Sequence, residues 1–288
     1  MSSLPTDTFT AADLDVMTPE VWSEKMNDFM RAKLVANSFF TDLSADVAGG
    51  GDVIHIPSLT EMTATEKANA TAVTLNSPTE TKVDLTVNQW YEVSFIIEDE
   101  EKAQVKHSYN LQERYAKNAA YTVANVLEVA LITLFSGFAS TVGDSATNAN
   151  DSNIRACIAY LDGNNIPQED RAWFFDPTVF WTDIMGIDRF TLVNESGNKA
   201  VMNGAIGVLY GIPVHLTSNI PTTLGSKYNA LAQKDAIIFA TASLGAGSGI
   251  RLQTSYLQTY LGTLVTADIL YGVIENRDLA GVLYKTAA

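Results

Sequence analysis

The feature that most constrains the fold of this chain is a long strand-like segment with too few large apolar residues to form its own core. The segment follows three consecutive glycines at positions 49–51 and ends near residue 97. Apolar and polar residues alternate in it, as at Val83, Leu85 and Val87, and a period of two is typical of β-strands. An isolated two-stranded hairpin is only marginally stable in water. The segment must therefore pack against something else.

Within this segment the sequence predicts three strands. Residues 53–57 form a short strand that Pro57 is expected to end, residues 83–87 form a second, and residues 91–97 form a third after a shift near Trp90. Residues 60–70 between the strands are poor in large apolar side chains. Two arrangements remain open: a long loop folded back on its own domain, or an arm that lies across a second copy of the protein.

A long helix is predicted after this segment. Acidic residues at 98–101 suit a helix N-terminus, and apolar residues recur on one face of a helix over 111–136 that ends near Gly137. Such a helix would be roughly 40 Å long. Its most apolar part, 123–138, is interrupted by polar residues that include Glu128, so we predict no membrane span.

The N-terminal residues predict a flexible leader followed by an amphipathic helix. Residues 1–17 have no signal-peptide pattern, and Thr18, Pro19 and Glu20 are typical of a helix start. Apolar residues then recur at roughly helical spacing as far as Phe40. Two partners for this helix remain equally open: the surface of its own chain and a neighbouring subunit.

The rest of the chain has the texture of an α/β domain. Residues 140–152 are predicted to form a loop and a boundary. The elements predicted after it are helices over 154–161 and 179–185 and strands over 173–175, 213–217, 236–240, 269–273 and 279–284, the last two returning to an earlier sheet.

Composition and charge exclude several classes of function. The 288 residues are 47% hydrophobic and 18% charged, enough for one large domain or two modest ones. The formal net charge of -15 repels phosphate, which argues against tight binding of nucleic acid but suits a non-adhesive container for DNA. Cys157 is the only cysteine, so no disulfide forms within the chain, and we expect it to be a small buried hydrophobe.

No catalytic, cofactor or metal site is predicted. The three histidines, His55, His107 and His215, lack a second ligand at metal spacing and are expected to be structural. The nucleophile-elbow pattern of hydrolases is absent. Glycine-rich residues 245–249 lack the lysine of a phosphate-binding loop, and the acids at 98–101 are expected to be solvated.

Several segments, taken in order, carry a resemblance to one family. They are Gly51–Pro57, Asp84–Asp99, Leu161–Pro167 with Arg171 and Asp176–Pro177, Asn203–Gly207 with Tyr210–Val214, and Tyr271–Tyr284. Together they resemble the Hong Kong 97-type major capsid proteins of tailed bacteriophages over nearly the whole chain. The resemblance implies an α+β fold with an N-terminal arm, an extended β-hairpin called the E-loop, a peripheral domain with a long spine helix, and an axial α/β domain.

The resemblance also implies a division of the chain. We expect an N-terminal arm over 1–48, the E-loop with its return strands over 49–97, and the peripheral domain over 98–145. The axial domain would cover 146–262, and 263–288 would return to the peripheral domain.

The function implied is that of a structural protein and not of an enzyme. Subunits would assemble as hexamers and pentamers into an icosahedral shell that encloses phage double-stranded DNA without sequence-specific binding. The resemblance further implies a portal protein, a separate scaffolding protein because the leader is short, and in some relatives a decoration protein. The chain would reside in the virion after assembly in the host bacterial cytoplasm, with no cofactor and no membrane. Neither Lys67 nor Lys82 matches the family's crosslinking motif, so no crosslink is predicted.

Two alternatives are weighed against this function, and one candidate interface is named. An encapsulin, the shell protein of a bacterial compartment, would have a similar fold and enclose an enzyme, and a soluble α+β hydrolase is a remoter alternative. We expect Val73, Leu75, Val83 and Leu85 to rest on an adjacent subunit, since nothing within their own segment covers them.

Overall fold

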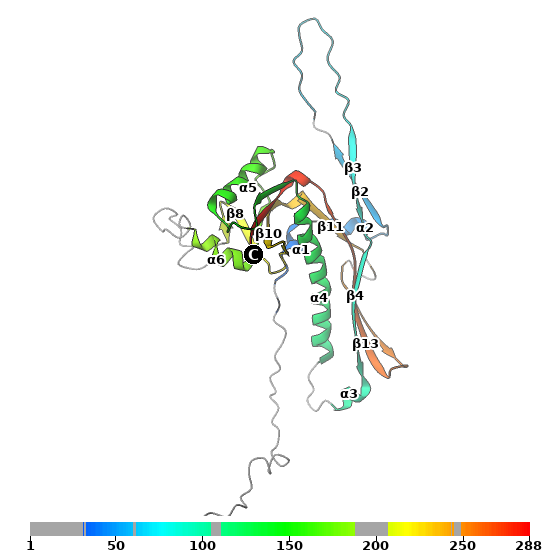
Figure 1. Cartoon of the computed structure of the whole chain (residues 1–288). Coiled ribbons are helices and arrows are strands. Elements are labelled where there is room, and N and C mark those ends of the chain that lie inside the picture. The colour runs from blue at the N-terminus through cyan, green and yellow to red at the C-terminus, as the bar shows by residue number, and fades with distance from the viewer. Residues whose placement is uncertain are drawn as a thin grey trace, which may run out of the picture.

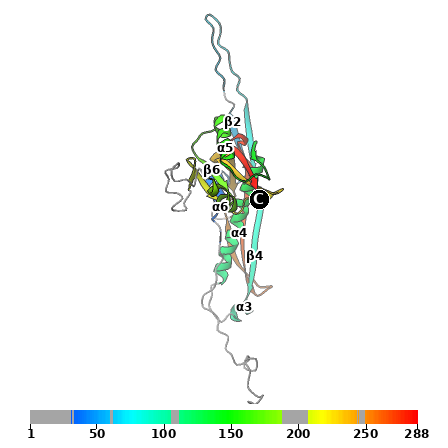
Figure 2. The ribbon, with the colours of Figure 1, turned by 60° about the vertical axis from the view of Figure 1, so that its left-hand side comes forward.

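Two β-sheets and a long helix form the body of the subunit, and a two-stranded hairpin extends away from it (Figure 1). The structure is a computed structural model and describes residues 31, 33–59, 62–104, 111–187, 207–242, 244 and 249–288. Figure 2, turned about the long axis, shows that the hairpin, β4 and α4 extend along that axis.

The first sheet is built on one long strand, β13 (Gly262–Glu275). Strand β4 (Gln89–Glu98) pairs along one edge of it, and β12 (Arg251–Leu257) and β11 (Ile237–Thr241) share the other, all antiparallel. The short β1 (Thr41–Asp42) continues the sheet in parallel with β11. Helix α4 (Leu111–Thr133) packs on β13 and β4, and the turn Leu134–Gly137 ends it. The predicted long helix is confirmed.

The second sheet carries the smaller helices. Its strand order is β5 (Ser140–Gly143), β14 (Gly281–Ala287), β10 (Ser226–Gln233), β6 (Arg171–Phe175), β8 (Ile212–Leu216) and β7 (Val208–Leu209), and β9 (Thr222–Thr223) pairs with β10. Buried residues of α5 (Asp151–Gly163) and α6 (Pro177–Thr182) share one apolar cluster with it. Cys157 lies in this cluster as a buried hydrophobe, as predicted, and burial raises the pKa of its thiol to about 12.

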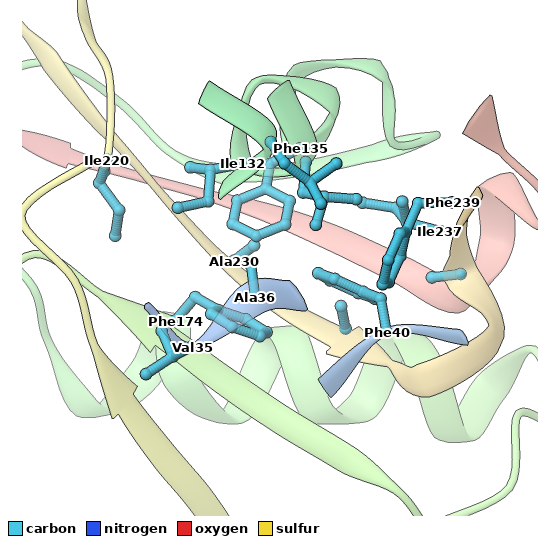
Figure 3. Packing of buried hydrophobic residues seen from close by; sticks show 14 of the residues in the cluster. Val35, Ala36, Phe40, Ile132, Phe135, Phe174, Ile220, Ala230, Ile237 and Phe239 are labelled. Atoms are coloured by element: carbon cyan, nitrogen blue, oxygen red, sulfur yellow. The ribbon is translucent and has the colours of Figure 1, made fainter. Parts of the chain in front are cut away.

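A cluster of aromatic side chains joins the two sheets (Figure 3). Every residue of β6 is buried, because Trp173 and Phe175 face the helices while Phe174 faces the first sheet. The Phe174 ring lies 5.5 Å from the ring of Phe40 and 5.3 Å from that of Phe135, centroid to centroid. Residues of both sheets and of α4 meet in this cluster, so burial of these rings holds the body together.

Most predicted elements are confirmed, and several expectations are wrong. Pro57 does not end its strand: β2 runs from Val53 to Leu59 and pairs only with β3 (Glu80–Thr86), so the missing N–H of the proline is tolerated on an edge strand. The predicted loop at 140–152 contains β5. The two C-terminal strands enter different sheets, since β13 pairs with β4 and β14 pairs with β10 and β5. The five-part division of the chain stays a prediction.

The predicted N-terminal helix lies mostly outside the described residues, which begin at Arg31. In the described part, residues 33–35 have no regular structure and α1 (Ala36–Phe39) is a single turn. The helical expectation is therefore wrong for residues 33–35, which lie along α4 instead of coiling.

By length and composition alone, residues Gln112–Gly137 could cross a membrane. In the structure this helix packs against β13 and β4 and contributes Val123, Leu127 and Leu131 to the aromatic cluster's core. The core helix of a soluble protein has the same composition, so this feature is weak support for a span.

The connection between β13 and β14 carries two neighbouring acids. Glu275 is partly buried at the end of β13, and a Cβ added to Gly137 would lie 2.3 Å from its Oε2 atom, so the carboxyl is packed closely. Asp278 begins the turn Asp278–Ala280 that leads to β14. Burial, and then a hydrogen bond and like charge from Asp278, raise the pKa of Glu275 from 4.5 to about 7.

Replacing Glu275 by glutamine is expected to stabilise the protein at neutral pH relative to the parent. A carboxyl whose pKa is raised on folding favours the folded state below the unfolded pKa and loses that contribution as pH rises through the folded pKa, here between 4.5 and about 7. Because the group is partly exposed, we expect a relative gain of about 1–2 kcal/mol across this window. Urea unfolding of both proteins at pH 4.5 and 7.5 measures it, with exposed Glu169→Gln as control. An equal difference at both pH values would contradict the prediction.

Candidate subunit interface

The hairpin β2–β3 is held to the body only at its base. Val53 pairs with Thr86 at the base, and Leu59 pairs with Glu80 at the far end. The chain enters β2 through Gly50 and Gly51, whose φ angles of 97° and 129° favour glycine. The chain leaves the hairpin between β3 and β4, where its backbone lies against β13.

At the base, apolar side chains of the hairpin are covered by their own chain. Leu85 is 0% exposed and lies in a cluster with Ile238 and Ala240 of β11 and with Val47 of α2 (Ser44–Val47). The expectation that Leu85 rests on an adjacent subunit is therefore wrong, because its cover comes from a strand of its own chain about 150 residues later in the sequence. Val83, two pairs further out, is partly exposed.

A close backbone crossing fixes the exit of the hairpin. The chain between β3 and β4 passes over β13 at Gly272, where an added Cβ would lie 2.2 Å from the Thr86 carbonyl oxygen. Only a residue without a side chain permits this approach. The crossing sets where the hairpin leaves the sheet.

Beyond the base, the hairpin is fully exposed. Every described residue from 62 to 79 is exposed, and Figure 1 shows this segment projecting well past the body. The predicted interface residues Val73 and Leu75 are 63% and 87% exposed. A hydrogen bond of 2.9 Å from Asn76 Nδ2 to the Thr63 carbonyl oxygen joins the two limbs. No described part of the chain covers this segment.

The outer face of the hairpin carries a small polar group of side chains. His55 Nδ1 lies 2.6 Å from Asp84 Oδ1, and Lys82 Nζ lies 3.0 Å from Asp84 Oδ2. The hydrogen bond from His55, and then that from Lys82, hold the pKa of Asp84 below its usual value. All three side chains are exposed, so the pairs contribute little to stability.

The histidines predicted to be structural lie in separate elements. His55 is in β2, and His215 is in β8 beside the rings of Phe39 and Phe174, where burial lowers its pKa. His107 lies outside the described residues, as do most of residues 245–249. Within the described ranges, no group of three or more His, Cys, Asp or Glu side chains could hold a metal ion.

A second exposed apolar surface lies at the opposite end of the molecule, and the sequence analysis did not identify it. Strand β12 exposes Leu252 and Tyr256, and the turn between β12 and β13 exposes Tyr260 and Leu261. This turn lies near α3 (Asp99–Gln104) in Figure 1. Tyr256 donates a hydrogen bond of 2.8 Å to Asp99 Oδ2, which raises the pKa of this tyrosine. Both ends of the long axis thus present apolar side chains to solvent.

Comparison with known proteins gives matches in structure alone. No protein-family model matches the sequence, and no curated protein matches it significantly. A structure titled Mycobacterium phage Che8 matches with a TM-score of 0.79 at 20% identity, over 93% of this chain and 96% of that chain. The capsid structure of cyanophage P-SCSP1u matches at 0.78 and 14% identity, over 98% and 96%. The mature capsid of bacteriophage PhiM1 matches at 0.74 and 11% identity, over 93% and 91%.

At these identities the likeness concerns the fold. It extends over nearly the full length of each chain. The chain has the α+β fold of phage capsid structures, which confirms the fold class that the sequence predicted.

Proposed function

We propose that this chain is a major capsid protein, which self-assembles into a closed icosahedral shell around phage double-stranded DNA. The observation that carries the proposal is the exposed hairpin segment 62–79, which projects from a body with the fold of phage capsids. A limb that its own subunit does not cover can be ordered and desolvated by another copy of the same chain. No active site is needed for this role.

Symmetry makes modest contacts sufficient. Each subunit in a closed shell makes the same contacts as every other, so many weak interfaces add to a stable particle. The exposed apolar side chains at both ends of the long axis supply such contacts in two directions. The net charge of -15 fits a wall that encloses DNA without binding it tightly.

Finer features of the proposal follow from the family resemblance. Hexamers and pentamers would be the intermediate assemblies, with residues 49–97 acting as the E-loop. A portal protein, a separate scaffolding protein and a decoration protein are the proposed partners, and assembly would take place in the host cytoplasm. Of the four interface residues first named, Val73 and Leu75 remain proposed contacts, with Val83 at the margin.

The capsid proposal is preferred to the encapsulin alternative because the matched capsid structures come from phages. An encapsulin shell would enclose an enzyme in place of a genome. Particles isolated from the native source distinguish the two by their contents, DNA or protein.

The purified full-length protein is expected to form large assemblies. Sedimentation velocity and electron microscopy over a range of concentrations should show closed particles or capsomers many times larger than the 31.2 kDa chain. A single monomeric species at every concentration, with residues 62–79 protected from protease, would contradict the proposal. Protection in a monomer would mean that the hairpin packs on its own subunit.

A further inference from the structure

Glu128 is a fully buried carboxylate in the C-terminal half of α4, 0% exposed. It contacts the chain where α1 begins, about 90 residues earlier in the sequence. Its Oε1 atom accepts hydrogen bonds from the backbone N–H groups of Val35, at 2.8 Å, and Ala36, at 2.9 Å. Its Oε2 atom accepts from Ala36 at 2.9 Å and from Asn37 at 3.2 Å. Both oxygens are therefore used to hold one short stretch of backbone.

A buried charge needs such partners to be tolerated. Burial of an ionised carboxylate is costly unless the group is paired or hydrogen-bonded. Among the described residues, Glu128 forms no ion pair with a lysine, arginine or histidine side chain. Three backbone N–H groups take the place of a cation, and hydrogen bonds to an ionised acceptor are stronger than neutral ones. The contact is thus specific to an acid at this position.

Arg31 makes a second contact with the same helix, closer to its N-terminus. One guanidinium nitrogen, Nη1, donates a hydrogen bond of 2.9 Å to the Lys117 carbonyl oxygen, and the group lies 5.2 Å from the centroid of the Tyr121 ring. The other nitrogen, Nη2, lies 3.5 Å from Asn118 Oδ1. The two contacts fix two points of the segment on α4.

The order of the two contacts along α4 sets the direction of the chain near them. Lys117 and Glu128 are separated by roughly 16 Å along the helix axis at the α-helical rise per residue. Five residues from Arg31 to Ala36 span at most about 17 Å when fully extended. Arg31 contacts the earlier turn and Val35–Asn37 the later one, so the described residues 33–35 run alongside α4 in the same direction as the helix.

We propose that Glu128 and Arg31 form a latch that holds residues 33–37 of the N-terminal arm along the spine helix α4. The latch aligns this part of the N-terminal arm with the spine helix and thus with the long axis of the subunit. That the arm then reaches a neighbouring subunit rests on the proposed function, whereas the latch itself does not. Glu128 and Arg31 are positioning residues for assembly.

Glutamine cannot replace Glu128 in this role. Its carbonyl oxygen could accept from two of the N–H groups, but its NH₂ group would face the others as a second donor. At least one buried N–H group would lose its acceptor. The phenylalanine cluster next to α1 would still hold Phe40 in the core, so loosening should be confined to the segment ahead of it.

Hydrogen exchange of the unassembled full-length subunit tests the latch. In the parent protein the N–H groups of Val35, Ala36 and Asn37 should be strongly protected. In Glu128→Gln they should exchange between about tenfold and about 100-fold faster, with unchanged exchange in β10 and β14. Glu113→Gln, an exposed acid on the same helix that pairs with Lys117, is the matched control and should leave the three groups unchanged. Unchanged exchange in Glu128→Gln would overturn the proposal.

Arg31→Gln gives an independent test, because it alters a surface contact that the fold does not need. Trypsin should then cleave after Lys33 faster than in the parent, at an unchanged melting temperature. If Glu128→Gln fails to fold, this variant decides: an unchanged cleavage rate would overturn the latch, and a faster rate would support it. Assembly is measured separately by electron microscopy, so a subunit that never assembles, with its latch intact, counts against the proposed function alone.

Discussion

Replacing Val73 and Leu75 together by aspartate is expected to abolish shell assembly and leave the subunit folded. The two side chains are 63% and 87% exposed at the far part of the hairpin, so they contribute little to the fold of their own chain. In an assembled shell they would be buried, and each buried aspartate would carry an unpaired charge into an apolar contact. Electron microscopy and sedimentation velocity measure assembly, and thermal unfolding by circular dichroism checks the fold.

The matched control is the double variant Ala72→Asp and Thr74→Asp. It adds the same two charges to the same limb but keeps the apolar side chains at 73 and 75. The large apolar side chains at 73 and 75 stay available for contact in this variant, so these charges should be tolerated better. Particles in normal yield from Val73→Asp/Leu75→Asp would refute the role of this surface. Loss of assembly in both variants would show that the limb is sensitive to charge on either side.

Leu85 shows why the residues for the assembly test have to be chosen from the structure. Its alternation with polar neighbours predicted a strand residue with one buried side, and that is confirmed. The sequence could not tell whether its cover comes from the same chain or another, because the covering residues Ile238 and Ala240 lie in a distant strand. An aspartate at Leu85 would disrupt the subunit itself, and loss of particles would then say nothing about the interface.

The elements that the sequence predicted well are those with a clear local period. Helix α4 and strands β3 and β4 each carry one continuous apolar pattern and were placed within a few residues. Strand β10 was missed, although five consecutive residues from Asn229 are buried. Asn229 reads as a turn residue, but its side chain bonds the Asp176 N–H group at 2.9 Å and Thr286 Oγ1 at 3.0 Å. Tertiary hydrogen bonds, which no local pattern reveals, make it compatible with a central strand.

The sequence could predict the candidate interface only where a segment has too few apolar residues to cover itself. The lean composition of residues 60–70 indicated a limb without a core, and the structure leaves its described residues exposed. The contact of Glu128 with the start of α1 was out of reach, because the partners are backbone N–H groups whose identity leaves no trace in the sequence. A polar residue on the apolar face of a long helix is the one local sign of such a contact.

Phe174→Ala is expected to cost about 3–5 kcal/mol of the free energy of unfolding. The Phe174 side chain is 0% exposed, and its ring lies within 5.5 Å of the rings of Phe39, Phe40 and Phe135, centroid to centroid. Strand β6 is paired on both sides, by β10 and by β8, so the backbone cannot collapse into the space left by the ring. Loss of these ring contacts adds to the cost of the cavity.

Chemical denaturation of the unassembled subunit measures this cost, with two comparisons that separate its causes. Phe174→Leu fills part of the cavity and should lose roughly a third to half as much stability. Trp181→Ala removes a larger aromatic side chain that is 52% exposed on α6, and it should lose less than about 1 kcal/mol. If Phe174→Ala proved as mild as Trp181→Ala, the aromatic cluster would not be what joins the two sheets. In that case the connections between the sheets, such as the turn after β13, would have to hold the body together.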